Sequence, residues 1–136
     1  MLKYVAGFLF SEDESVVLLI MKNRPEWMAG FLNGIGGKIK EGETPIGAME
    51  RECKEETGLE GVQWRGQVIL EGPGWQVTFF VARSNLLKQA DSLTDERVMA
   101  VRVADLPMHP VVPNLRWLIP LCLSREVLGP TRILCR

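Results

Sequence analysis

Residues 37–59, GKIKEGETPIGAMERECKEETGL, contain the most informative pattern of this sequence. Glu52, Glu55 and Glu56 stand at positions i, i+3 and i+4, so on a helix they project from one face. Like charges at this spacing repel one another, and the repulsion by itself does not stabilise the fold. Carboxylate oxygens are the ligands that magnesium prefers. The stretch therefore indicates a helix that binds a divalent cation.

The same stretch contains signals for both ends of that helix. Thr44 is a suitable N-cap, Pro45 suits the first helical position, and Gly58 suits a left-handed C-cap. Between these ends, an apolar stripe facing the core is predicted at Ile46, Met49 and Cys53. The three carboxylates lie mostly off this stripe, which predicts that they face solvent.

The stretch matches the Nudix box, G-x5-E-x7-R-E-U-x-E-E-x-G-U, in which U is apolar. The fixed positions are Gly37, Glu43, Arg51, Glu52, Glu55, Glu56 and Gly58, with Cys53 and Leu59 at the apolar ones. The chain therefore resembles the Nudix hydrolases, which cleave nucleoside diphosphates linked to a further group. The alternative is an ordinary acidic helix exposed to solvent. Such a helix does not need seven fixed residues at these spacings, so the full match favours the Nudix box.

The resemblance extends towards the MutT-like branch, which sanitises oxidised purine nucleoside triphosphates. Residues 17–38 resemble its strand, loop and turn, and Asn33 stands in the N-G-x-G-G-K context that supplies its base-reading asparagine. Residues 117–123, WLIPLCL, resemble its final helix. One region departs from the pattern: adjacent aspartates precede that helix in the branch, whereas residues 109–117, HPVVPNLRW, contain no acid. Asn114 is a partial substitute, and the preference for an oxidised purine is left open.

Strands are predicted on both sides of the helix. Apolar and β-branched runs predict them at Tyr4 to Phe10, Val16 to Met21, Val62 to Glu71, Trp75 to Arg83 and Val98 to Val103. A last helix, capped by Asn114, is predicted from Leu115 to about Val127, followed by a short tail. The 136 residues suffice for one domain, residues 1–136. The resemblance implies the Nudix fold, an α/β class with a mixed β-sheet sandwiched between helices (α/β/α).

The expected metal ligands are Glu52, Glu55 and Glu56, together with a backbone carbonyl of Gly36 or Gly37. One to three Mg²⁺ ions are expected there, and Mn²⁺ is a candidate substitute. These ions would bridge phosphate oxygens and lower the pKa of a bound water. Glu52 or a downstream acid would accept the proton of that water, and the sequence leaves this choice open.

Two further residues belong to the predicted catalytic set. Glu96, in the segment LTDERV, is the candidate downstream acid and a candidate metal ligand, because the resembling branch has an acid in a similar context. The alternatives are a solvated turn and a role of Asp95 in capping the local backbone. Arg51 precedes the metal carboxylates and can pair with Glu43 or Glu55. This position favours orientation of the site over direct contact with substrate.

Substrate recognition is predicted from residues near the glycine-rich turn. The candidate phosphate ligands are the cations Lys22, Arg24 and Lys38, of which Lys38 directly follows the double glycine. Asn33 can donate to and accept from a base edge, and Trp27 can stack on the base. The alternatives are that Asn33 only satisfies the backbone of its turn and that Trp27 is a rim residue.

Bulk properties exclude several classes of protein. The composition, 46% apolar and 24% charged, is that of an ordinary globular domain, and a net charge of −1 provides no basic field for a nucleic acid polymer or a membrane. No apolar run approaches the length of a spanning helix. Three scattered cysteines without a CxxC pair fit a reducing cytoplasm. We expect a cytoplasmic monomer or homodimer whose partner is a small nucleotide substrate.

The leading hypothesis is an enzyme, a Nudix hydrolase acting on phosphoanhydride bonds. It predicts Mg²⁺-dependent hydrolysis of a nucleoside triphosphate to a nucleoside monophosphate and pyrophosphate, with an oxidised purine such as 8-oxo-dGTP as one candidate substrate. The alternatives within the family are dinucleoside polyphosphate, ADP-ribose and nucleotide-sugar pyrophosphatases. A different class is a catalytically silent nucleotide-binding regulator, in which the box is usually broken, whereas here it is intact.

Overall fold

The computed structural model describes residues 1–127 and 129–136 of the chain. The strands are β1 (Leu2–Phe10), β2 (Val16–Met21), β3 (Leu32–Asn33), β4 (Ile35–Lys38), β5 (Arg65–Gly72), β6 (Trp75–Arg83), β7 (Val98–Arg102) and β8 (Thr131–Leu134). The α-helices are α1 (Pro45–Thr57) and α2 (Leu115–Leu123). Short 3-10 helices lie at η1 (Glu26–Met28), η2 (Asn85–Gln89) and η3 (Val103–Met108).

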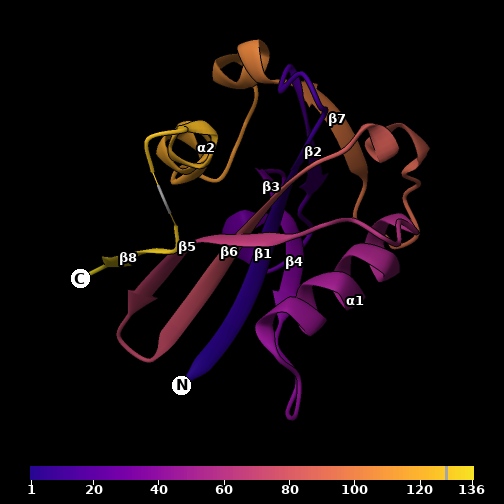
Figure 1. The fold of residues 1–136 in the computed structure, drawn as a ribbon. Coiled ribbons are helices and arrows are strands. Elements are labelled where there is room, and N and C mark those ends of the chain that lie inside the picture. The colour runs from indigo at the N-terminus through magenta and orange to yellow at the C-terminus, as the bar shows by residue number, and fades with distance from the viewer. Residues whose placement is uncertain (128) are drawn as a thin grey trace.

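Within the described residues, eight strands form one mixed sheet. Its order is β3-β2-β1-β6-β5-β8, while β4 pairs with β1 and β7 pairs with β2. Strand β1 is central, because it runs antiparallel to β2 and β4 and parallel to β6 (Figure 1). This arrangement places β4, which contains Gly37 of the Nudix box, directly beside the central strand β1.

The helices cover opposite faces of this sheet. Helix α1 packs through Met49 and Cys53 onto one face, where β1 contributes Val5 and Leu9. Helix α2 packs onto the other face, in a separate core cluster whose members include Phe8, Phe10, Leu115, Leu118 and Ile119. Figure 1 shows the sheet between the two helices. The predicted α/β/α architecture is therefore confirmed.

The ends of α1 are as predicted. The Thr44 hydroxyl accepts a hydrogen bond from the Gly47 N–H at 3.1 Å, Pro45 occupies the first position, and Gly58 ends the helix with φ 78°. The predicted apolar stripe is only partly right. Met49 and Cys53 are buried, but Ile46 is exposed, and the buried face is completed by Ala48, Glu56 and Thr57.

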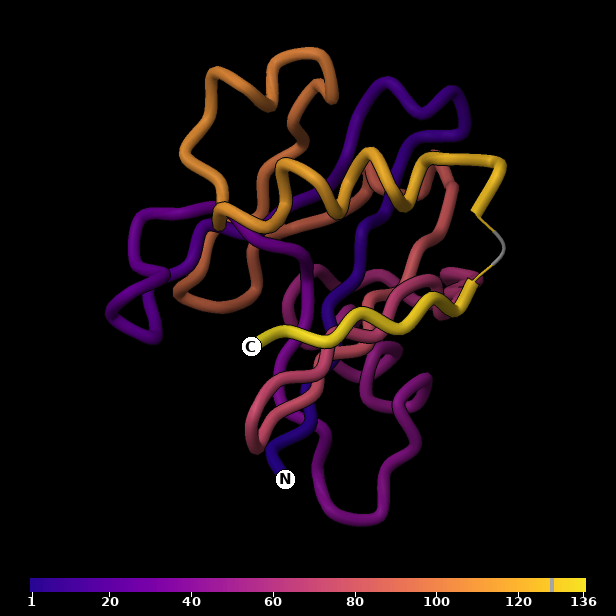
Figure 2. Tube along the Cα trace, turned by 90° about the vertical axis from the view of Figure 1, so that its left-hand side faces the viewer, coloured from indigo at the N-terminus to yellow at the C-terminus, as the bar shows by residue number. Residues whose placement is uncertain are grey.

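The C-terminal part of the fold differs from the prediction. Helix α2 ends at Leu123, before the predicted Val127, and the predicted tail contains strand β8, which pairs in parallel with β5. Figure 2 shows β8 running back below α2 in the opposite direction. Leu128, where the predicted tail begins, lies outside the described residues. No helix in the described part of the chain is long and apolar enough to cross a membrane.

Other strand predictions need little correction. The predicted bounds of Val16–Met21 and Trp75–Arg83 are confirmed, and β1 begins two residues earlier than predicted, at Leu2. Strand β5 begins at Arg65, later than the predicted Val62, because residues 59–64 form an irregular connection after α1. These differences do not move the functional site.

Candidate active site

Arg51 connects the acidic helix to the turn that precedes it. Its Nε and Nη2 donate to the two carboxylate oxygens of Glu43 at 2.7 and 3.0 Å, a bidentate pair. Nη1 donates to Glu52 at 3.0 Å and to Glu55 at 3.2 Å, and Nη2 also reaches the Lys38 carbonyl at 3.1 Å. This geometry agrees with the predicted role of Arg51 in orienting the site.

The pairing of Arg51 with Glu43 also fixes the charge of that carboxylate. The Arg51 hydrogen bonds, followed by the Lys40 backbone N–H, lower the pKa of Glu43 to about 2. Glu43 is thus ionised at neutral pH and keeps the guanidinium in place. Arg51 therefore holds α1, the end of β4 and the intervening turn together.

Glu56 is buried, and this corrects the prediction of an exposed helix face. Its exposed fraction is 6%, and its Oε2 has no hydrogen-bond partner among the described residues. Burial, and then the neighbouring Glu52 carboxylate, raise the pKa of Glu56 well above its usual range. A buried carboxyl group in this position is stabilised in its charged form by a cation. Of the three helix carboxylates, only Glu55 is exposed.

The two glycines of β4 bring the backbone against Glu52. A Cβ atom on Gly37 would lie 2.5 Å from Glu52 Oε1, and one on Gly36 would collide with the Val5 carbonyl oxygen of the adjacent strand. Both positions therefore need the missing side chain for close approach. Carboxylate oxygens on α1 and main-chain groups of β4 thus lie side by side.

These residues fit a divalent cation. The donor set consists of carboxylate and backbone oxygens, which suits Mg²⁺, and the unpartnered Glu56 Oε2 is the atom that a cation would satisfy. Among residues 1–127 and 129–136, no three acidic, histidine or cysteine side chains are already grouped around one point. Glu52 and Glu55 each give one oxygen to Arg51, Oε1 and Oε2 respectively, which leaves the second oxygen of each carboxylate for a cation.

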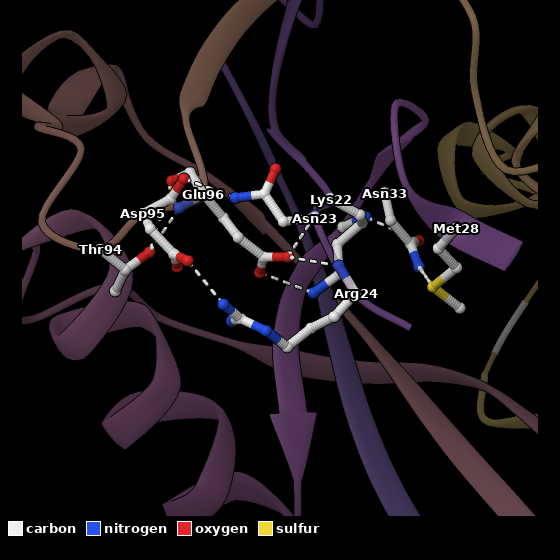
Figure 3. A network of polar contacts seen from close by, with 9 residues as sticks. Lys22, Asn23, Arg24, Met28, Asn33, Thr94, Asp95 and Glu96 are labelled. Atoms are coloured by element: carbon white, nitrogen blue, oxygen red, sulfur yellow. Dashed lines mark hydrogen bonds and ion pairs between the residues drawn. The ribbon is translucent and has the colours of Figure 1, made fainter. Parts of the chain in front are cut away.

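Glu96 is buried beside the loop that follows β2. Its Oε1 accepts from Lys22 Nζ at 2.8 Å, and its Oε2 accepts from the backbone N–H groups of Asn23 at 2.6 Å and Arg24 at 3.3 Å (Figure 3). Burial opposes ionisation, but the Lys22 ammonium and the Asn23 N–H outweigh it and lower the pKa of Glu96. The solvated-turn alternative for Glu96 is therefore wrong.

The predicted phosphate ligands occupy different environments. Lys22 is paired with Glu96 and only 16% of its side chain is exposed, whereas Arg24 forms an exposed pair with Asp95 at 2.5 Å. Lys38 ends β4 with an exposed side chain next to Gly37. Of the three predicted cations, Lys38 is therefore the one that is exposed without an ion pair to a described residue.

The predicted base-reading residues come from segments that the fold brings together. Asn33 Oδ1 accepts from the Gly34 N–H at 2.8 Å, so the side chain does satisfy a neighbouring backbone group, as the alternative role proposed. Its Nδ2 donates to Met28 Sδ at 3.7 Å. The neighbouring Leu32 bridges to Val111, three residues before Asn114. Trp27 lies in η1 with 64% of its surface exposed.

Asn114 behaves differently from the predicted helix cap. It stands at the N-cap position of α2, but its side chain makes no capping hydrogen bond. Its Oδ1 is buried without a partner among the described residues. An amide oxygen in this state is an acceptor left over for a ligand, because buried polar groups are normally satisfied.

Two cavities border the site residues, and Arg51 lines the first of them. One, of about 550 Å³, separates α1 from residues 59–64 and is lined by Cys53 and Trp64 but by none of the box glutamates Glu52, Glu55 and Glu56. The other, of about 540 Å³, is an apolar groove between η3 and α2. Neither contains the acidic or amide groups needed for the predicted chemistry.

Sequence reasoning missed Asn23 and Met28, and it considered Asp95 only as a cap of local backbone. In the structure, Asn23 and Asp95 join the loop after β2 to the segment before β7. The Asn23 side chain donates to the Asp95 carbonyl at 2.7 Å, and Met28 accepts from Asn33. The partners are separated by 72 positions in the case of Asn23 and Asp95, so no local pattern connects them. Only the three-dimensional fold identifies them.

Comparisons with known proteins agree with this arrangement. A MutT structure from work on Aliivibrio salmonicida and Vibrio cholerae is 22% identical, with a TM-score of 0.73, and the match covers 89% of this chain and 96% of that one. An ADP-ribose pyrophosphatase from Streptococcus suis is 23% identical (TM-score 0.70; 96% and 97% covered). The NUDIX domain of Shewanella oneidensis NrtR, complexed with ADP ribose, is 19% identical (TM-score 0.80; 93% and 88% covered).

These likenesses confirm the fold, and the sequence match establishes the family. The family model described as "NUDIX domain" matches residues 2–122, which is most of the chain. The predicted class of enzyme, a hydrolase acting on pyrophosphate bonds, is confirmed at the level of this family. With an intact Nudix box on α1, this chain belongs to the NUDIX domain family.

Proposed function

We propose that this chain hydrolyses a nucleoside triphosphate to a nucleoside monophosphate and pyrophosphate in the presence of Mg²⁺. The observation that carries the proposal is the placement of Glu52 against the backbone of Gly37, together with the buried and unpartnered Glu56 Oε2 on the same helix. These groups would hold the cation, with Glu55 turning inward from the protein surface. When bound, the cation neutralises phosphate charge and makes a water molecule more acidic.

The residues of the chain divide the remaining work. Glu52 is the proposed acceptor of the proton from the attacking water, because both oxygens of Glu96 already accept hydrogen bonds. Arg51 keeps Glu52 and Glu55 beside β4 through its bidentate pair with Glu43. Lys38 would supply positive charge to the phosphate chain from the end of β4, because positioning and charge neutralisation dominate phosphoryl chemistry.

The nucleobase would be read on the other side of the turn. Asn33 offers an amide group, Asn114 offers an acceptor oxygen without a partner, and Trp27 offers an exposed indole for stacking. These groups support recognition of a nucleobase, with an oxidised purine as one candidate. Lys22 and Arg24 would contribute to phosphate binding only after leaving their carboxylate partners.

ADP-ribose hydrolysis to AMP and ribose 5-phosphate is the second candidate. Two of the structural neighbours, the S. suis pyrophosphatase and the ADP-ribose-bound NrtR domain, favour it. The same cation site would serve either reaction, because both break a phosphoanhydride bond. The two candidates differ in what lies beyond the diphosphate, which the residues of α1 do not contact.

One assay separates these candidates. The purified chain is incubated with normal and oxidised nucleoside triphosphates, dinucleoside polyphosphates, nucleotide sugars and ADP-ribose, each with Mg²⁺, with Mn²⁺ or with a chelator. Pyrophosphate release from a triphosphate, abolished by the chelator, supports the proposal. AMP release from ADP-ribose alone supports the second candidate, and binding without turnover of any compound identifies a regulator.

A further inference from the structure

Residues 22–30 form a loop between β2 and β3 that carries the exposed Trp27. The loop is closed at its base, where Lys22 N–H donates to the Phe31 carbonyl and Gly30 N–H donates to the Lys22 carbonyl, both at 2.9 Å. Inside the loop, Met28 N–H donates to the Pro25 carbonyl. These bonds fix the base and the tip, but residues 23 and 24 need partners from elsewhere in the chain.

Those partners are Asp95 and Glu96, which together we term the carboxylate clamp. The Glu96 carboxylate binds both backbone N–H groups of residues 23 and 24, as described above, and the Asp95 carbonyl accepts from the Asn23 side chain at 2.7 Å. The Arg24 guanidinium pairs with the Asp95 carboxylate. Figure 3 shows the clamp facing one side of the loop along residues 22–24.

Glu96 is the dominant member of the clamp. Its side chain is 8% exposed, and its three donors are an ammonium and two backbone N–H groups, so the bonds are charge-assisted and shielded from water. The Arg24–Asp95 pair is exposed on both sides, 66% and 61%, and such pairs contribute little. Loss of Glu96 would leave the half-buried Lys22 and two backbone N–H groups without their acceptor.

The far end of the loop reaches the proposed base site. Met28 follows Trp27 directly, and its sulfur accepts from Asn33 Nδ2, so the orientation of the Asn33 amide depends on where the loop lies. A shift of residues 23 and 24 would therefore be passed to both base-reading side chains. The clamp touches neither Asn33 nor Trp27 in any of the hydrogen bonds described above, so it acts on them through the loop.

We propose that Glu96 is a positioning residue, which holds the loop of residues 22–30 in the conformation where Trp27 and Asn33 read the nucleobase. The specificity part of this inference rests on the nucleotide hydrolysis proposed above, whereas the loop-holding part does not. Glu96 then sets which base is accepted, and the cation site on α1 sets how fast the bond is broken.

Hydrogen exchange tests loop holding without any substrate. Exchange of the peptide containing residues 22–31 is compared between the wild-type chain, Glu96→Ala, Glu96→Gln and Asp91→Asn. In Glu96→Ala we expect exchange of the Asn23 and Arg24 amides to rise by about tenfold or more, because hydrogen bonds to a charged acceptor are lost. Glu96→Gln retains one acceptor oxygen and should restore part of the protection. Asp91→Asn removes an exposed carboxylate before the same segment and should change nothing.

Kinetics on a purine and a pyrimidine triphosphate test the specificity part. We expect Glu96→Gln to change the ratio of kcat/KM between the two bases by about fivefold to tenfold, mainly through KM. Trp27→Ala should have a smaller effect in the Glu96→Gln background than in the wild-type chain, because residues that act through one element are not additive. Circular dichroism and thermal melting establish that each variant is folded.

The outcomes separate the possible failures. Unchanged exchange in both Glu96 variants overturns loop holding, whether or not the chain is active. If Glu96→Gln slows turnover by about a thousandfold or more and leaves the base ratio unchanged, positioning is overturned and Glu96 is identified as a proton acceptor or metal ligand. If the wild-type chain hydrolyses no triphosphate, the proposed function fails, and nucleotide binding affinities replace kinetics: an altered base ratio supports the specificity part and an unaltered one overturns it.

Discussion

The two halves of the proposed site are built in opposite ways. The cation half comes from one contiguous stretch, in which Arg51 locks Glu43, Glu52 and Glu55 against the end of β4. The base half is assembled from separate segments. The Asn33 side-chain oxygen accepts a hydrogen bond from the adjacent Gly34 N–H, and the Asn114 side-chain oxygen has no partner among the described residues. The first half is pre-organised for one reaction, whereas the second retains free hydrogen-bonding capacity that a ligand must complete.

This contrast predicts how substitutions divide. Changes on α1 should reduce turnover of every substrate alike, because they remove cation binding or its orientation. Changes around Asn33 should alter which base is preferred and leave the bond-breaking step largely intact. The following variants test whether effects on turnover and on base preference are separate, and they are ordered by the size of the expected effect.

Glu56→Gln should slow turnover of all substrates by about a thousandfold, because the charge of a buried cation ligand is lost while the side chain keeps its shape. The stabilisation that Mg²⁺ gives the wild-type chain in thermal melting should also disappear. Glu50→Gln, which changes an exposed acid on the same helix, is the control. Full activity of Glu56→Gln would remove this residue from the cation site.

Arg51→Ala should slow turnover by about tenfold to a hundredfold, as expected for a residue that orients metal ligands without contacting substrate. The requirement for Mg²⁺ should rise in parallel, because Glu52 and Glu55 lose their common partner. Both quantities follow from steady-state rates over a magnesium titration. Lys54→Ala removes an exposed cation of the same helix, and an equal effect there would show that only general charge matters.

Asn33→Ala should raise KM for the preferred base by about tenfold, the worth of a lost hydrogen bond in a partly buried site, with kcat nearly unchanged. Rates measured across a panel of triphosphates provide the test. Asn85→Ala, at the N-terminal end of η2, is the matched control. Equal losses on all bases would assign Asn33 to the turn alone.

Glu43→Gln should have the smallest effect, confined to stability in acid. The folded pKa of Glu43 is about 2, below its ordinary value of 4.5, so its ionised form stabilises the fold. That contribution is complete above about pH 4.5 and is lost as the pH falls towards 2. Urea unfolding between about pH 2 and about pH 6 should therefore show a shallower loss of stability in Glu43→Gln than in wild type. Glu60→Gln, which breaks a fully exposed pair, should follow the wild-type curve more closely.

Much of the cation half was predictable because its signals are local. Thr44, Pro45 and Gly58 define the bounds of α1, and the spacing of the glutamates defines the box. The burial of Glu56 was not predictable, because the apolar positions of α1 favour a stripe that includes Ile46. The sheet instead covers Glu56 and Thr57 and leaves Ile46 exposed. Which face of a helix is covered is decided by the strands packed against it.

The base half was predictable only as separate residues. The glycine-rich context of Asn33 identifies it, but its neighbourhood with Asn114 depends on the bridge between Leu32 and Val111. The pair of Lys22 with Glu96 joins positions 74 apart, and periodicity carries no information at that range. Strand β8 escapes sequence-based prediction for the same reason, since its only strand partner within the described residues, β5, lies far earlier in the chain.

Because the side-chain oxygen of Asn114 has no hydrogen-bond partner among the described residues, substitution at this position should cost little stability. Since no neighbour in the described structure depends on it, exchanging asparagine for the uncharged serine disturbs little of the surrounding architecture. A single substitution at the N-terminus of α2 could then change the preferred nucleobase without altering the residues of the cation half.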